Sequence, residues 1–132
     1  MTEKVVNSRS KEIKGSAKWT HMTVGNCIKI YQIICDLMTM VPKLPKPLPD
    51  WMSPGCIVSE GIQDYAESIL NDEAFWASLP PQLVNKEIKD KEILTVGVKI
   101  SDELYVANIT RYPTVNTRSL RNKLKRTLDE CR

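Results

Sequence analysis

The sequence is poor in the residues from which most catalytic and metal sites are built. Its 132 residues include a single histidine, His21, and four cysteines, none of them in a C-x-x-C pair. Zinc sites need several His or Cys ligands at short spacings, so we expect no metal and no cofactor. The five glycines are scattered, and neither a P-loop nor a dinucleotide-binding G-x-G-x-x-G motif is present. We therefore expect no small-molecule substrate and no enzyme that depends on a nucleotide or a metal.

Long apolar runs are also absent. The most apolar stretch, residues 27–41, is interrupted by Lys29 and Asp36, and it is shorter than the roughly 20 residues that a membrane-spanning helix needs. The beginning of the chain, MTEKVVNSRSKEIKG, lacks the apolar core of a secretory signal. We expect a cytoplasmic or nuclear protein, peripheral at membranes at most and not secreted, whose cysteines stay reduced.

Length and composition predict one folded domain. Hydrophobic residues make up 42% of the chain and charged residues 27%, which are ordinary proportions for a globular protein with one core. Residues 1–18 are polar and basic, and we expect them to form a flexible basic arm. Residues 19–132 then form a single α+β domain. Within it, residues 42–55 hold five prolines and predict an extended proline-rich connector.

The strongest periodic element covers residues 24–41. Apolar residues recur there at helical spacing. The polar positions form one narrow stripe: Lys29, Gln32, Asp36 and Thr39. This pattern predicts a mostly buried central helix, with Thr23 as its N-cap and Pro42 just beyond its end. One alternative stays open, in which residues 19–34 form a β-hairpin.

Shorter patterns predict the remaining elements. Two or three further helices are expected at residues 59–70, 72–79 and 117–130. Two β-rich runs, residues 93–100 and 104–111, predict one β-hairpin. Residues 82–92 are charged and predict either a further helical turn or a loop.

The charges segregate along the chain. Residues 1–49 hold eight Lys or Arg against three Asp or Glu (net +5), residues 50–106 four against eleven (net −7), and residues 107–132 seven against two (net +5). A basic surface attracts the phosphates of nucleic acid or of anionic lipid. The residues that we expect to bind such a surface lie in the arm and the last helix: Lys4, Arg9, Lys11, Lys14, Arg118, Arg121, Lys123, Lys125 and Arg126.

These features predict a non-enzymatic structural or interaction protein that contacts nucleic acid or an anionic membrane through its basic termini. The same charges would also fit a solvated surface that pairs with the acidic middle of the same molecule. They fit a homo-oligomer too, in which basic ends meet the acidic middle of neighbouring copies. Trp51 and Met52 are candidate apolar anchors of a protein interface, unless they cover the core. The design fits a small viral matrix, coat or accessory protein.

Two alternative functions remain open. A regulator would bind a cellular or host protein through the acidic middle or the proline-rich connector. An enzyme would be built on a Cys–His dyad that joins His21 to Cys27, Cys35 or Cys56. Cys27 and Cys35 lie on the apolar face of the predicted central helix, where a thiol behaves as a small inert hydrophobe. Cys56 is therefore the remaining candidate nucleophile.

Overall fold

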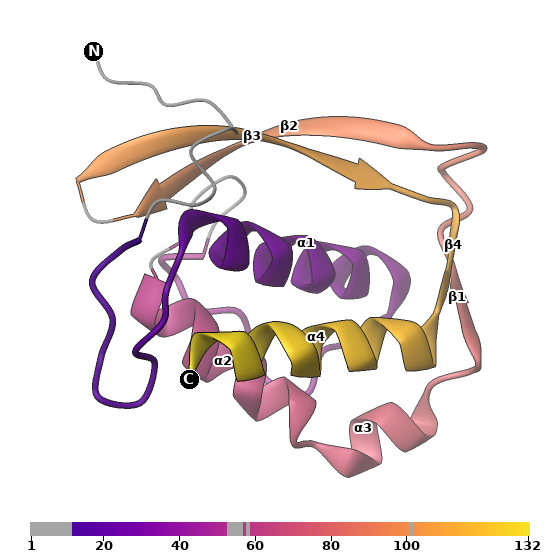
Figure 1. Ribbon diagram of the computed structural model, residues 1–132. Coiled ribbons are helices and arrows are strands. Elements are labelled where there is room, and N and C mark those ends of the chain that lie inside the picture. Colours follow the sequence, from indigo (N-terminus) through magenta and orange to yellow (C-terminus); the bar gives the residue numbers. More distant parts are fainter. Residues whose placement is uncertain (1–11, 53–56, 58, 101) are drawn as a thin grey trace.

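The computed structural model describes residues 12–52, 57, 59–100 and 102–132. These residues form a small α+β domain with four helices, an antiparallel β-hairpin and a second, short two-stranded sheet (Figure 1). The elements are, in chain order, α1 (Val24–Met40), α2 (Ser59–Leu70), α3 (Glu73–Ser78), β1 (Gln82–Val84), β2 (Glu92–Ile100), β3 (Glu103–Arg111), β4 (Thr114–Asn116) and α4 (Thr117–Cys131). The predicted fold class is confirmed. None of the described helices is long and apolar enough to cross a membrane.

Helix α1 forms the centre of the core. Thr23 caps it as predicted, because its hydroxyl accepts a hydrogen bond of 3.1 Å from the amide of Asn26. The helix ends at Met40, and Val41 is already extended before Pro42. The alternative β-hairpin over residues 19–34 is wrong. The apolar residues of this segment follow a helical period, and almost all of them are buried.

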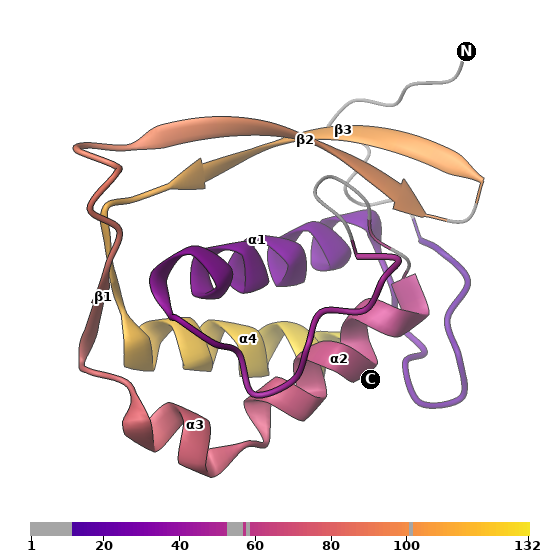
Figure 2. The same cartoon turned by 180° about the vertical axis from the view of Figure 1, so that it is seen from behind.

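The other elements enclose α1 from two sides. Helices α2 and α4 pack against it on one side, and the β2–β3 hairpin covers it on the other (Figures 1 and 2). The hairpin keeps a continuous register from the pair Glu92–Arg111 to the pair Ile100–Glu103. Its contact with α1 is made mainly through β3, where the Gln32 side-chain amide donates a hydrogen bond of 2.7 Å to the carbonyl of Thr110.

The short sheet at one end of the molecule was not predicted. Part of residues 82–92, expected to be a helical turn or a loop, forms β1, which pairs antiparallel with β4. Leu83 lies opposite Val115 in this pairing and is buried. Burial of Leu83 favours the strand, and its partner strand comes from a distant part of the chain. This sheet sets the position at which α4 begins.

The segments before α1 and after it lie against the helices. The amide of Ile13 donates to the carbonyl of Met22 at 3.1 Å, so residues 12–18 of the predicted arm turn back toward α1, while residues 1–11 lie outside the described part. In the proline-rich connector, the Tyr65 hydroxyl donates a hydrogen bond of 2.8 Å to the carbonyl of Lys46. The last connector positions, residues 53–55, are outside the described residues.

Candidate anion-binding face of helix α4

Helix α4 is built as a two-faced element. Its N-cap Asn116 accepts a hydrogen bond of 2.9 Å from the amide of Ser119. The leucines that recur every four residues, Leu120, Leu124 and Leu128, are buried against the core. Burial of this seam fixes the rotation of the helix, so the residues on its opposite face point to solvent. Three residues of that face are exposed cations: Arg118, Lys125 and Arg126.

These three cations form no ion pair with any residue that the structure describes. The first turn of α4 contains no acidic residue, and Arg118 lies there, where the helix dipole already has its positive end. The charge of Arg118 therefore has the same sign as the end of the helix dipole beside it. Such a turn is unfavourable for helix stability and favourable for an anion. The two acidic residues at the other end of the helix, Asp129 and Glu130, are also exposed and limit the basic face to the turns before them.

Arg121, which the sequence analysis assigned to the same site, already forms an ion pair within the molecule. Its guanidinium donates a hydrogen bond of 2.7 Å to the Glu73 carboxylate and lies 5.5 Å from the centre of the Trp76 ring. Both partners belong to α3. Arg121 thus attaches α3 to α4, and it stands at the border of the basic face with its charge compensated.

Lys123 lies half-buried at the opposite border of the face. The positive charges of Arg111 and Lys123 favour the ionised form of the Asp36 carboxylate, but burial outweighs them and raises the pKa of Asp36 to about 6. The charge of Lys123 therefore partly compensates the buried Asp36 carboxylate of α1. It contributes to the basic face only from the side.

Part of the acidic middle pairs with the basic ends inside one molecule. The Glu67 carboxylate on α2 forms ion pairs with Lys18 and with Arg132, the latter at 3.0 Å. The Arg132 guanidinium also lies 4.8 Å from the centre of the Trp19 ring, and the Trp19 indole N–H donates to Asp64 at 2.9 Å. The two ends of the domain are thereby tied to α2. The cations on the exposed face of α4 take no part in this pairing.

Of the basic arm residues predicted to bind an anionic surface, only Lys14 lies in the described part of the chain. Lys4, Arg9 and Lys11 lie outside the described residues. Lys14 is exposed and forms no ion pair with the described residues. The structure therefore brings together only the members of the site that lie on α4.

Trp51 and Met52, the candidate interface anchors, pack inward in the described structure. Met52 is 3% exposed and belongs to the core, and Trp51 packs against it. The Trp51 ring lies so close to Gly61 that a β-carbon there would meet it at 2.1 Å. An interface that uses these side chains would have to be formed at the partly exposed edge of Trp51.

The described cysteines lack the properties of a nucleophile. Burial raises the pKa of Cys27 to about 12 and that of Cys35 to about 11, and burial also raises the pKa of Cys131. Their thiols are protonated at neutral pH, whereas nucleophilic attack needs the thiolate. His21 is exposed, and Cys56 lies outside the described residues.

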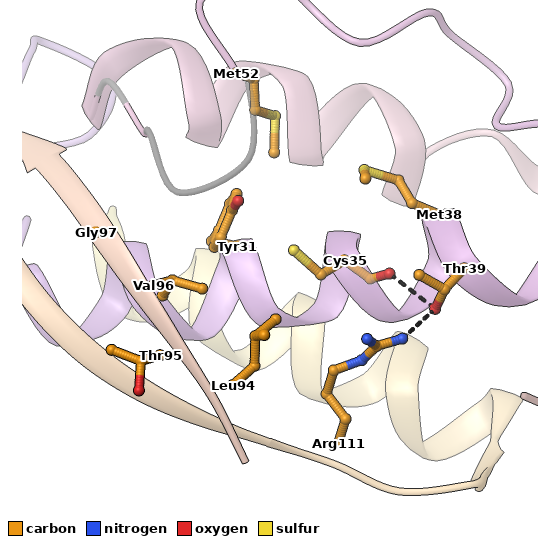
Figure 3. A pocket seen from close by; sticks show the side chains of 10 residues that line it. All are labelled: Tyr31, Cys35, Met38, Thr39, Met52, Leu94, Thr95, Val96, Gly97 and Arg111. Atoms are coloured by element: carbon orange, nitrogen blue, oxygen red, sulfur yellow. Dashed lines mark hydrogen bonds between the residues drawn. The ribbon is translucent and has the colours of Figure 1, made fainter. Parts of the chain in front are cut away.

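One polar cluster was missed by the sequence analysis. At the end of β3, the Arg111 guanidinium donates a hydrogen bond of 2.8 Å to the Thr39 hydroxyl (Figure 3). It donates another, of 3.3 Å, to Glu92. Its Nε atom lies 3.8 Å from the Asp36 carboxylate. The polar stripe of α1, with an acidic residue on an otherwise apolar helix, was the available signal. The partner of Asp36 could not be predicted, because Arg111 comes from a strand that is distant in the sequence.

Comparisons with protein-family models, with curated proteins and with solved structures gave no match. Among the described residues, no group of three or more His, Cys, Asp or Glu is placed to hold a metal ion. The exposed cations of α4 are the candidate functional site that the described residues present.

Proposed function

We propose that this chain is a non-enzymatic interaction protein that binds the phosphates of nucleic acid through the exposed face of α4. The observation that carries the proposal is the set of three exposed cations, Arg118, Lys125 and Arg126, without an ion-pair partner among the described residues. Arg and Lys side chains that neutralise phosphates release condensed counterions, which supplies most of the affinity in sequence-independent binding.

The composition of the face favours nucleic acid over a membrane surface. A helix that lies in a membrane interface inserts an apolar face among the lipids. The apolar side of α4 is buried in the core, and its exposed side presents polar and charged residues such as Ser119 and Asn122. Binding by charge and hydrogen bonds alone suits a phosphodiester chain.

The test compares two variants with the same net charge. The first changes Arg118, Lys125 and Arg126 to Glu. The control changes Lys46, Lys86 and Lys89 to Glu, three exposed lysines outside α4. The affinity of the full chain for a fluorescein-labelled DNA duplex is measured by anisotropy at several salt concentrations.

We expect the α4 variant to lose most of its affinity. With about three phosphate contacts removed, the slope of log K against log salt should become shallower by about 2.7. The control variant should keep most of the slope. Equal losses in both variants would mean that only the total charge matters, and binding to anionic vesicles without binding to DNA would assign the face to a membrane. Either result would overturn the proposal.

A further inference from the structure

An apolar cavity of about 410 Å³ lies between α1 and β2 (Figure 3). This volume is within the range of roughly 300–1,000 Å³ that is usual for binding pockets. Most of its lining is apolar: Tyr31, Cys35, Met38, Met52, Leu94 and Val96. Thr39 and Arg111 close one end. Four consecutive residues of β2, 94–97, line it, so the cavity lies along the edge of this strand and not only under one face.

The inner layer of the hairpin is incomplete above this cavity. Side chains alternate along a strand, and Leu94 shares the inner face with Val96 and Val98. The two valines are buried, but Leu94 is 37% exposed, and Met38 across the cavity is 36% exposed. An inward-facing leucine that remains exposed indicates a place where a further apolar side chain would complete the packing.

The backbone at this edge of β2 pairs with no other strand in the described part of the chain. Ile100 pairs with Glu103 across two intervening positions, and in a hairpin of this length the closing pair exchanges hydrogen bonds. The alternation then directs the N–H and C=O groups of every second residue to the other edge of the strand. These residues are Ile93, Thr95, Gly97 and Lys99.

Strand β2 has charged residues only toward its two ends, and the other features that protect an edge from pairing are missing between them. Its register is continuous, and no proline or charge occurs between Glu92 and Lys99. In the described part of the chain its sheet has only two strands. Edges without bulges, prolines or central charges readily add another strand.

Charge disfavours a second copy in the centred register of this edge and favours a segment with acidic ends. Lys91 and Lys99 are exposed at the two ends of this edge, on either side of Ile93, which is 62% exposed. A second copy paired antiparallel about Thr95 would place Lys91 opposite Lys99, and like charges opposite each other are destabilising. A segment with acidic ends would compensate both lysines.

We propose that β2 is a docking edge for an extended segment of a partner protein, with apolar residues alternating between two acidic ends. The segment adds as a third strand, and one of its apolar side chains fills the cavity. Strand β2 and helix α4 lie on opposite sides of α1 (Figure 1). The docking edge and the proposed phosphate-binding face therefore belong to different elements.

The probe is a synthetic peptide, acetyl-Glu-Val-Thr-Leu-Thr-Leu-Thr-Val-Glu-amide. Its control has Lys at both ends and is otherwise identical. Binding to the full chain is measured by fluorescence anisotropy, and the contact is located from amide chemical shifts. We expect shifts at residues 93–99 and an affinity about 2- to 30-fold weaker for the Lys-ended peptide. The double variant Lys91→Glu/Lys99→Glu should reverse this preference.

A proline variant tests the backbone contact. Thr95→Pro removes one outward N–H and none of the backbone hydrogen bonds to β3, and we expect about 2- to 10-fold weaker binding of the Glu-ended peptide. Thr95→Val is the matched control, because it keeps the N–H and loses only the side-chain hydrogen bond to Asn108, 2.9 Å long. It should bind as the parent chain does. If Thr95→Pro fails to fold, the charge-reversal variant still decides the question.

Several outcomes would overturn the proposal. One is equal affinity for the two peptides, and another is equal loss in Thr95→Pro and Thr95→Val. A dimer seen by light scattering that Thr95→Pro dissociates would assign the edge to a second copy. If sodium oleate, and not the peptide, shifts the amides of residues 94–97, the cavity is a lipid pocket.

Discussion

The side chains of Asp36 and Arg111 form an ion pair that is nearly enclosed by protein. Arg111 Nε lies 3.8 Å from Asp36 Oδ1, and neither atom makes a hydrogen bond with the described residues. Asp36 is 6% exposed. Such a pair attaches the end of β3 to α1, but its attraction only partly offsets the cost of burying the carboxylate.

This pair predicts a pH dependence of stability. Burial raises the pKa of Asp36 from its ordinary value of 3.8 to about 6, so between these values the folded chain binds more protons than the unfolded chain. The contribution of Asp36 to the free energy of unfolding therefore falls as the pH rises through this window, by on the order of 1–3 kcal/mol. Asp36→Asn lacks this term, and its stability relative to the parent chain should increase from pH 4 to 7.

Urea unfolding at several pH values measures this difference. Glu92→Gln serves as the control, because the Glu92 side chain is 48% exposed and meets the same arginine from the solvent side. Its stability relative to the parent chain should change little over the same window. A difference between Asp36→Asn and the parent chain that is independent of pH would contradict the prediction.

The contact of Trp51 with Gly61 predicts that the effect of Gly61→Ala on stability changes sign when Trp51 is removed. A β-carbon at Gly61 would lie 2.1 Å from Trp51 Cζ2, so Gly61→Ala should displace the ring and cost about 1–3 kcal/mol. In α2 the same substitution has a favourable helix propensity of about 1 kcal/mol. We expect Gly61→Ala to destabilise the parent chain and to stabilise the Trp51→Ala variant, as measured by thermal unfolding. Additive effects would show that the ring does not pack on Gly61.

The raised pKa values of Cys27 and Cys35, about 12 and about 11, predict slow thiol chemistry. In a Cys56→Ser background, which removes the thiol outside the described residues, alkylation by iodoacetamide near neutral pH should be at least about 100-fold slower in the folded chain than in denaturant. Mass spectrometry with peptide mapping assigns the sites. Rapid modification of Cys35 in the folded chain would mean that the cavity between α1 and β2 opens far more than the structure shows.

The sequence predicted the elements whose signal is local. The buried face of α1, the leucine seam of α4 and the adjacent runs that form the β2–β3 hairpin each repeat within a few residues, so their periods are visible without the rest of the fold. The β1–β4 sheet was missed because each strand has only three residues and its partner is remote. Strand pairing of this kind depends on tertiary structure.

The candidate site was predictable only in part, for the same reason. The sequence places Arg118, Arg121, Lys125 and Arg126 on one helix, but it does not show which of them already has a partner. The ion pair with Glu73 that occupies Arg121 depends on how α3 packs against α4. Only the structure therefore distinguishes the cations without an ion-pair partner among the described residues from Arg121, which has one.

Arg118 provides a last prediction, in which stability and binding change in opposite directions. It lies in the first turn of α4, which contains no acidic residue. A glutamate in this turn would interact favourably with the positive end of the helix dipole. We expect Arg118→Glu to raise the free energy of unfolding by about 0.3–1 kcal/mol at low ionic strength and to weaken DNA binding. Arg118→Gln, which removes the charge without reversing it, should lie between the two in both measurements. A residue retained for stability would show the opposite order in urea unfolding, with the parent chain most stable and the glutamate variant least.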